Sequence, residues 1–175
     1  MKDDKLINEK IIEKFPGKNI NALPRVIKIV VNVGAGKVTQ DPKYIEKISQ
    51  DFSNVTGQKP IKTRARQSIS GFKIRSGMDV GIKATLRGKR MKDFLNRLIN
   101  IVLPRIRDFR GIKRSAVTQG GTINIGIKEH IVFPEIKHDD VEKVFGMQIN
   151  IVTTAKNKAD AIKLLSAYGM VFEKK

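Results

Sequence analysis

Two predicted strands, a short one near Ile61–Ala65 and an alternating one at Val80–Arg87, most constrain the fold of this chain. The segment between them contains Gly71 and Gly77 and is too short for a helical crossover, so the two strands must pair antiparallel. The second stretch alternates apolar residues with small or polar ones: Val80, Ile82, Ala84 and Leu86 against Gly81, Lys83, Thr85 and Arg87. This pattern predicts a strand with one buried face and one cationic face.

Further strands are predicted on both sides of this hairpin. The segment Arg25–Gly34 alternates so that Ile27, Ile29, Val31 and Val33 share one face, while Val26, Lys28, Val30 and Asn32 share the other. Isoleucines at every second position mark a strand at Ile123–Ile127, and a similar pattern marks another at Met147–Ile151.

Helices are predicted between these strands. Helical periodicity covers residues 5–15, a segment that follows Asp41-Pro42 and closes at Gly57, and a segment from Met91 to Val102 that ends at Pro104. A short helix is predicted from the cap at Asp139-Asp140. A last helix is predicted to run from about Lys158 to a stop at Gly169.

These elements predict an α+β fold, in which an antiparallel sheet carries helices on one face and leaves the other face and the loops free. Residues 1–175 form one domain in this prediction, with residues 1–20 as an N-terminal helix. The free face would display Lys28, Asn32, Lys83, Thr85 and Arg87.

The positive charge of the chain is concentrated in two regions. The formal net charge is +18, and residues 59–90 alone contribute +9, with ten Lys or Arg against the single acid Asp79. A second basic cluster, Arg105–Arg114, falls in a predicted loop, whereas residues 129–175 sum to zero. This asymmetry favours one strongly cationic surface for a polyanion and one near-neutral surface.

The sequence does not favour an enzyme, a metal site or a cofactor site. The segment Gly34-Ala35-Gly36-Lys37 departs from a phosphate-binding loop, which needs Gly at position 31 and Ser or Thr at position 38, where this chain has Val31 and Val38. The dinucleotide motif needs Gly in place of Thr39. A tight turn, open to contact with an RNA phosphate, explains these glycines.

The histidines and the acidic cluster have structural explanations. His130 and His138 match no metal spacing, so a surface or core role is expected for both. The acids Asp139, Asp140 and Glu142 are explained by helix capping. The sequence therefore predicts no catalytic residues, no metal and no cofactor.

The sequence shows no membrane or secretion signal. The N-terminus is charged throughout, the longest apolar runs are far shorter than a bilayer span, and there is no cysteine. We therefore expect a soluble cytosolic protein. A basic peripheral membrane protein and a phosphate-handling enzyme are the alternatives, but the most basic segment is strand and loop and not an amphipathic helix.

Nucleic acid is the expected partner, and a folded RNA fits best. Aromatic residues make up 6% of the chain, Trp is absent, and the predicted free face carries no aromatic ring on which single-stranded bases could stack. Lys, Arg, Thr, Ser, Asn and Gln suit contacts with phosphates and 2′-hydroxyls. No basic recognition helix for DNA stands out.

Four segments carry a resemblance to a known family. They read LPRVIKIVVNVGAGKV (23–38), TGQKPIKTRARQSISGFKIRSGMDVGIKATLRGKRM (56–91), LPRIRDFRGI (103–112) and INIGIKEHIVFPEI (123–136). In this order they resemble the bacterial family of large-subunit ribosomal protein five, from about residue 23 to residue 155. The family carries 5S ribosomal RNA (rRNA) in the central protuberance, and its fold is an antiparallel sheet with helices on one side.

The resemblance implies specific roles for residues of this chain. The residues implied to bind 5S rRNA are Asn32, Gly34, Gly57, Gln58, Lys59, Thr63, Arg64, Arg66, Ser68, Lys83, Thr85, Arg87 and Gly88. The loop Lys73–Val80 resembles the family's loop that touches peptidyl-site tRNA, through Lys73, Arg75, Ser76, Gly77 and Met78. Asp79 stands where the family often has Pro.

The remaining contacts implied by the resemblance concern the small subunit and other parts of the ribosome. Arg105, Arg107, Arg110, Lys113 and Arg114 would face the small subunit or other rRNA, where the family forms a bridge with small-subunit ribosomal protein thirteen. The segment Pro134–Val144 would be its near-neutral, protein-facing side. The implied partners are thus 5S rRNA, 23S rRNA, peptidyl-site tRNA and other central-protuberance proteins, in the cytoplasm.

Overall fold

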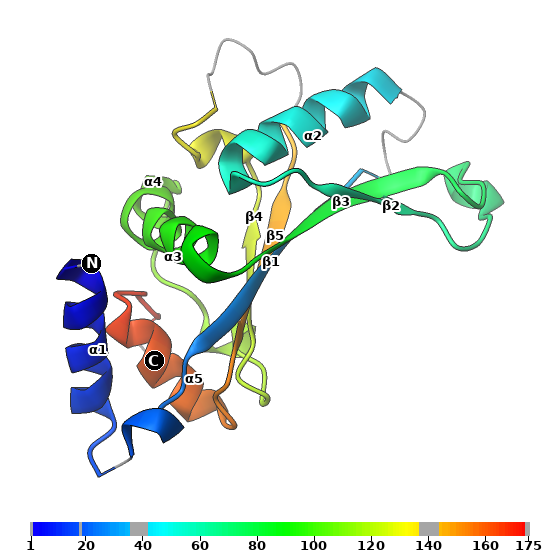
Figure 1. The fold of residues 1–175 in the computed structure, drawn as a ribbon. Coiled ribbons are helices and arrows are strands. Elements are labelled where there is room, and N and C mark those ends of the chain that lie inside the picture. The colour runs from blue at the N-terminus through cyan, green and yellow to red at the C-terminus, as the bar shows by residue number, and fades with distance from the viewer. Residues whose placement is uncertain (1, 18, 36–41, 137–143, 174–175) are drawn as a thin grey trace.

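The fold is α+β, as predicted, and is built on one antiparallel sheet (Figure 1). The computed structural model describes residues 2–17, 19–35, 42–136 and 144–173. The five strands, in the order β2-β3-β1-β5-β4, are β1 (Val26–Gly34), β2 (Ile61–Arg64), β3 (Asp79–Leu86), β4 (Ile123–Ile127) and β5 (Met147–Thr153). The helices are α1 (Lys2–Lys14), α2 (Pro42–Thr56), α3 (Gly88–Arg97), α4 (Leu103–Arg105) and α5 (Lys158–Ala167).

One face of the sheet forms the core beneath the helices, and the other face remains open. On the covered face, alternate residues of β1, β3, β4 and β5 are buried, including Ile29, Val31, Ile82, Leu86 and Ile149, whereas the edge strand β2 has no buried residue. Their neighbours along each strand are mostly half-buried or exposed. The two-residue alternation thus separates a hydrophobic core from a polar surface, as the sequence predicts.

The strand β1 departs from the predicted alternation at its beginning. Val26 is buried and Ile27 is 42% exposed, the reverse of the faces predicted for them. The pairing register between β1 and β5 shifts between Val26 and Lys28. This bulge inserts an extra residue, which reverses the orientation of the side chains that precede it.

The helix that follows β3 was predicted to end at Pro104. This prediction is wrong, because the helical segment continues through Pro104. A π-helical turn, Leu98–Val102, joins α3 to α4, and the Leu103 N–H donates to the Leu98 carbonyl. Proline lacks an N–H and its ring crowds the carbonyl of the preceding turn, and a wider turn relieves this crowding. The helix therefore reaches Arg105 before the chain turns into the second basic cluster.

The N-terminal helix packs on the last helix and not on the sheet. Contacts join α1 to α5, and Ile11 and Phe15 are buried there. The Lys163 Nζ lies 5.9 Å from the centre of the Phe15 ring. At the end of α5, Gly169 has a φ of +94°, which confirms the predicted stop. Asp41 and the helix predicted at Asp139-Asp140 lie outside the described residues.

Candidate nucleic-acid interface

The strand register arranges the open face of the sheet into two long cross-strand rows. The first row crosses all five strands: Ile61, Lys83, Asn32, Gln148 and Gly126. The second row crosses four: Thr85, Val30, Asn150 and Asn124. Neither row contains a carboxylate, and Lys83 lies exposed within the first. A surface of amides, hydroxyls and cations without acids suits a polyanion with hydroxyl groups, which RNA is.

Two glycines lie side by side at one end of this face: Gly81 is buried and Gly34 is exposed. Thr63, Gly81 and Gly34 are paired in a third row, beyond Lys83. A Cβ on Gly81 would lie 2.7 Å from the Val33 carbonyl oxygen and 3.0 Å from the Thr63 Oγ1, so no side chain fits there. A Cβ on Gly34 would meet no atom within 4 Å. A phosphate backbone can therefore come close to β1 where the strand ends.

The turn after α2 is fastened to the same face. The Gln58 Nε2 donates a hydrogen bond to the Thr85 carbonyl, at 3.3 Å. The Thr56 hydroxyl donates to the carbonyls of Phe52 (2.8 Å) and Gln58 (3.0 Å), and Gly57 takes a positive φ of +66°. These bonds bring the predicted residues Gly57 and Gln58, with Lys59 next in the chain, beside β3.

At the other end of β3, Arg87 and Gly88 form the entry to α3. Arg87 is the N-cap residue of that helix, and both residues are exposed. We call this surface the platform, and it comprises the three rows together with residues 57–59 and 87–88. It gathers most residues predicted to bind 5S rRNA: Asn32, Gly34, Gly57, Gln58, Lys59, Thr63, Lys83, Thr85, Arg87 and Gly88.

Beyond β2 and β3 the chain forms a projecting tip, residues 65–78, which we call the finger (Figure 1). Backbone bonds join Ala65 to Met78 (2.8 Å) and to Gly77 (3.0 Å) at its base. Two mutual bonds between Ile69 and Ile74, at 2.8 and 3.1 Å, close its end around the 3-10 turn Ser70–Phe72. The loop predicted between these strands is thus the hydrogen-bonded end of a hairpin.

The finger also contains two residues that the resemblance assigned to 5S rRNA. The Ser76 N–H donates to the Ser68 Oγ at 2.9 Å, and the Ser76 hydroxyl donates to the Arg66 carbonyl at 3.3 Å. Arg66 and Ser68 therefore lie beside the predicted tRNA-contacting residues Lys73, Arg75, Ser76, Gly77 and Met78. The structure separates these two residues from the sheet rows.

The single acid of the basic stretch is neutralised where the finger joins the sheet. The Asp79 carboxylate lies 3.7 Å from the Lys62 Nζ and 3.7 Å from the Arg64 Nε. Asp79 begins β3, so it is outside the finger, although the predicted loop extended to Val80. The Asp79 carboxylate is paired with Lys62 and Arg64 of β2. It therefore does not neutralise the cations of the finger.

The second basic cluster lies on a separate part of the molecule. Its five predicted cations are all exposed: Arg105, Arg107, Arg110, Lys113 and Arg114. The loop that carries them is held by Ile112, whose N–H donates to the Val171 carbonyl at 2.9 Å and whose carbonyl accepts from the Glu173 N–H at 3.1 Å. The C-terminal segment thus anchors this loop beside α5.

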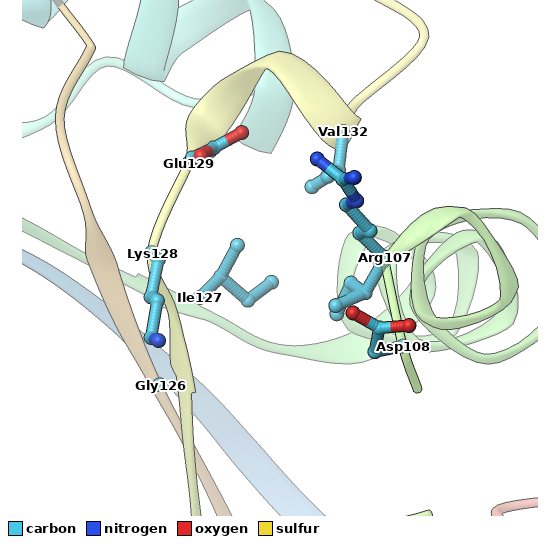
Figure 2. Close-up of a pocket in the computed structure, with 8 residues that line it drawn as sticks. Arg107, Asp108, Gly126, Ile127, Lys128, Glu129 and Val132 are labelled. Carbon is cyan, nitrogen blue, oxygen red and sulfur yellow. The ribbon is translucent and has the colours of Figure 1, made fainter. Parts of the chain in front are cut away.

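A cavity of about 430 Å³ lies between this loop and the end of β4 (Figure 2). Figure 2 shows Arg107 and Asp108 across the cavity from Lys128 and Glu129, with apolar Ile127 toward the middle and Val132 beside Arg107. Its lining combines two cations with two anions. Such a balance does not favour a phosphate group, so this cavity is distinct from the platform and the finger.

His130 is a core residue. Its side chain is fully buried and stacks on the Phe145 ring, with 3.8 Å between ring centres. The Phe145 N–H donates to His130 Nδ1 at 3.3 Å, and burial lowers the pKa of the imidazole below its ordinary value of 6.5, against an opposing effect of Asp51. His138 lies outside the described residues, and the described ones hold no cluster of metal-binding side chains.

Sequence reasoning missed two groups of residues in this region. Gln148, Asn150 and Asn124 continue the platform onto β5 and β4, but their place depends on the strand order, which the sequence does not reveal. Phe72, at the end of the finger, is 71% exposed. The sequence could have indicated this exposure, because Phe72 lies between Gly71 and Lys73 and belongs to no periodic apolar pattern.

Comparison with known families agrees with this geometry. The family model described as "Ribosomal protein L5" matches residues 19–75, and a second model, which describes the C-terminus of the same ribosomal protein family, matches residues 79–172. The chain belongs to the ribosomal protein L5 family. This confirms the resemblance drawn from the four sequence segments, and a ribosomal protein of this family is not an enzyme.

Three relatives show how far the similarity extends, and each is named large ribosomal subunit protein uL5. The Halothermothrix orenii protein is 52% identical over 163 residues, which cover 93% of this chain and 91% of that protein. The Syntrophomonas wolfei protein is 50% identical over 163 residues (93% and 92%). The Thermoanaerobacter sp. protein is 46% identical over 173 residues (99% and 97%). In the described residues, no helix is long and apolar enough to cross a membrane.

Proposed function

We propose that this chain is a structural constituent of the bacterial large ribosomal subunit, in the cytoplasm, and that its platform binds 5S rRNA. The observation that supports this best is the open sheet face, whose two long rows carry amides, a hydroxyl and Lys83 but no carboxylate. The names of its relatives support the subunit.

The side chains of the platform are suited to binding a folded RNA. Lys83 and Arg87 neutralise phosphates, while Asn32 and Thr85 offer hydrogen bonds to 2′-hydroxyls and base edges. Because the Gln58 side chain is already bonded to the Thr85 carbonyl, the turn after α2 is positioned before RNA arrives. The platform thereby attaches 5S rRNA to the central protuberance.

The finger contacts a second RNA, peptidyl-site tRNA, through Lys73, Arg75, Ser76, Gly77 and Met78. It projects beyond the sheet, and its internal hydrogen bonds hold Ser76 in place beside Ser68 and Arg66. A projecting cationic tip can reach an RNA that the platform does not hold. This division gives one chain two RNA partners at once.

The third proposed contact joins the chain to the small subunit and to 23S rRNA. The exposed arginines of the second basic cluster face rRNA, while the mixed-charge cavity beside Arg107 suits a protein such as small-subunit ribosomal protein thirteen or another protein of the central protuberance. Val144, at the end of the near-neutral segment, is 51% exposed. Crosslinking through Val144 to a small-subunit protein is expected, and crosslinks to RNA alone would contradict the bridge.

A gel-shift competition tests the main proposal. The full chain is mixed with 5S rRNA, and tRNA and a 23S rRNA fragment are added as competitors at physiological salt. Selective retention of 5S rRNA is the expected result, and equal displacement by every RNA would contradict it. Binding to anionic liposomes instead of RNA would favour a peripheral membrane protein, and turnover of ATP or GTP would favour a phosphate-handling enzyme.

A further inference from the structure

Phe72 is the most exposed large apolar side chain in the part of the chain that the structure describes, at 71%. It lies at the end of the finger, followed by Lys73 and preceded by Gly71. Exposure of a whole aromatic ring to water is unfavourable and needs a reason, and Ile69, which accepts a hydrogen bond from the Phe72 N–H, is also 47% exposed.

The finger holds this ring in a defined position. The Phe72 N–H donates to the Ile69 carbonyl at 3.3 Å, and the Lys73 N–H donates to the Ser70 carbonyl at 2.9 Å. Lys73 adopts a left-handed backbone with a φ of +54°, which is uncommon for a residue other than glycine. Strained backbone of this kind persists where the surrounding bonds impose it. The exposed ring is thus presented by a built turn.

The groups around the ring identify the kind of surface that it meets. Lys73, Arg75 and Arg66 are exposed in the same finger, and the serines Ser68, Ser70 and Ser76 supply hydroxyls. The Asp79 carboxylate is already engaged by Lys62 and Arg64. An exposed aromatic ring in a finger that also carries exposed cations and hydroxyls is complementary to a nucleobase flanked by phosphates.

We propose that Phe72 stacks on an unshielded base, or on the outer face of a terminal base pair, of a folded RNA, while Lys73 and Arg75 hold the adjacent phosphates. The proposal rests on the finger's proposed role as a tRNA contact and specifies how that contact is made. Stacking tolerates any base, because every base has a flat π face. The finger therefore recognises an exposed base surface and not a sequence.

A Phe72→Trp variant of the full chain provides a direct probe, because the natural sequence contains no tryptophan. Its indole fluorescence is expected to be quenched by a folded tRNA transcript and only weakly by 5S rRNA. Ile20→Trp is the matched control, since Ile20 is 69% exposed in a different part of the molecule. Its signal is expected to stay unchanged with either RNA.

A second variant measures the contribution of the ring. Phe72→Leu keeps an apolar side chain but removes the π face, and it is expected to weaken tRNA binding roughly tenfold. Unchanged affinity together with an unquenched Phe72→Trp signal would overturn the proposal. A Phe72→Trp signal that changes with vesicles of phosphatidylserine and phosphatidylcholine, and not with RNA, would overturn it in favour of a membrane contact.

The experiment separates this inference from the broader proposal. A Lys83→Glu change in the Phe72→Trp background should weaken 5S rRNA binding roughly 100-fold and leave quenching by tRNA intact. If quenching occurs with every folded RNA and without a preference for tRNA, base stacking by Phe72 stands and the assignment of its target fails. If 5S rRNA never binds but tRNA still quenches, the platform's role alone fails.

Discussion

The cations of the platform and of the finger come from one continuous basic stretch, residues 59–90, yet the two regions present this charge differently. On the platform the cations lie among amides and hydroxyls that are set by strand pairing, with Asn32 opposite Lys83. On the finger the cations surround an exposed aromatic ring that is set by a local turn. If the proposed function holds, similar net charge serves two kinds of RNA contact, one to a broad backbone surface and one to a single base surface.

Charge reversal at the centre of the platform should have the largest effect on this comparison. Lys83→Glu replaces an attraction for phosphate by a repulsion in the middle of the carboxylate-free row, and 5S rRNA binding should weaken roughly 100-fold, or about 2.7 kcal/mol. Filter binding measures this loss. Lys156→Glu makes the same charge change away from the platform and should cost only a few-fold. Equal losses would mean that total charge, and not position, governs binding.

Removal of one cation at the platform's edge should have a smaller effect with a characteristic salt dependence. Arg87→Ala should weaken 5S rRNA binding roughly tenfold, because one phosphate contact is lost. The slope of log affinity against log salt should fall by about one unit, since each neutralised phosphate releases counterions. A slope that equals the wild-type slope would place Arg87 away from phosphate.

Removal of a cation from the finger should affect the second RNA only. Arg75→Ala should leave 5S rRNA binding nearly unchanged and weaken tRNA binding several-fold, because the finger projects beyond the sheet rows. Parallel titrations with the two RNAs measure this difference. A similar loss for both RNAs would show that the platform and the finger act as one surface.

The smallest expected effect concerns stability and lies outside both regions. Burial lowers the pKa of His130, so the folded protein binds fewer protons than the unfolded chain once the pH falls below about 6.5. Its stability should therefore decrease slightly as the pH falls below 6.5 toward the folded pKa. In the other direction, the His130 contribution is fully favourable above pH 6.5.

Denaturant unfolding at several pH values tests this effect. His130→Asn should unfold more easily overall and show a flatter pH dependence below 6.5, while its relative preference for 5S rRNA over tRNA stays unchanged. His138→Asn is the matched control and should keep the pH dependence. If the pH dependence of stability disappeared in His138→Asn but persisted in His130→Asn, the assignment of this titration to His130 would be wrong.

The sequence predicted those parts of the fold that depend on local pattern. The alternation from Val80 to Arg87 placed Lys83 and Thr85 on the open face, and Gly169 marked the end of the last helix. Ile27 was placed on the wrong face, because a bulge in the β1–β5 pairing reverses the alternation and no local residue announces it. Pro104 was taken as a helix end, although a π-helical turn accommodates it.

The candidate site was predictable in the same uneven way. The resemblance brought together Asn32, Gln58 and Thr85, and the register and the Gln58 bond to Thr85 account for their proximity. Gln148 was missed because it lies opposite Asn32 only through a pairing between distant segments. Phe72 was missed because exposure of a side chain in a turn has no periodic signature.

The strand order determines when the platform can be completed during synthesis. β5 is the last strand to be synthesised, yet it lies between β1 and β4. β4 pairs with β5 and therefore cannot join the sheet before β5 is present. A nascent chain that has emerged only as far as α3 can already pair β1, β2 and β3 and present Asn32, Lys83 and Thr85. Gln148, Asn150 and Asn124 take their places only when β5 inserts. The platform can thus begin to form while the chain is still being translated, and it is complete only after β5 has been made.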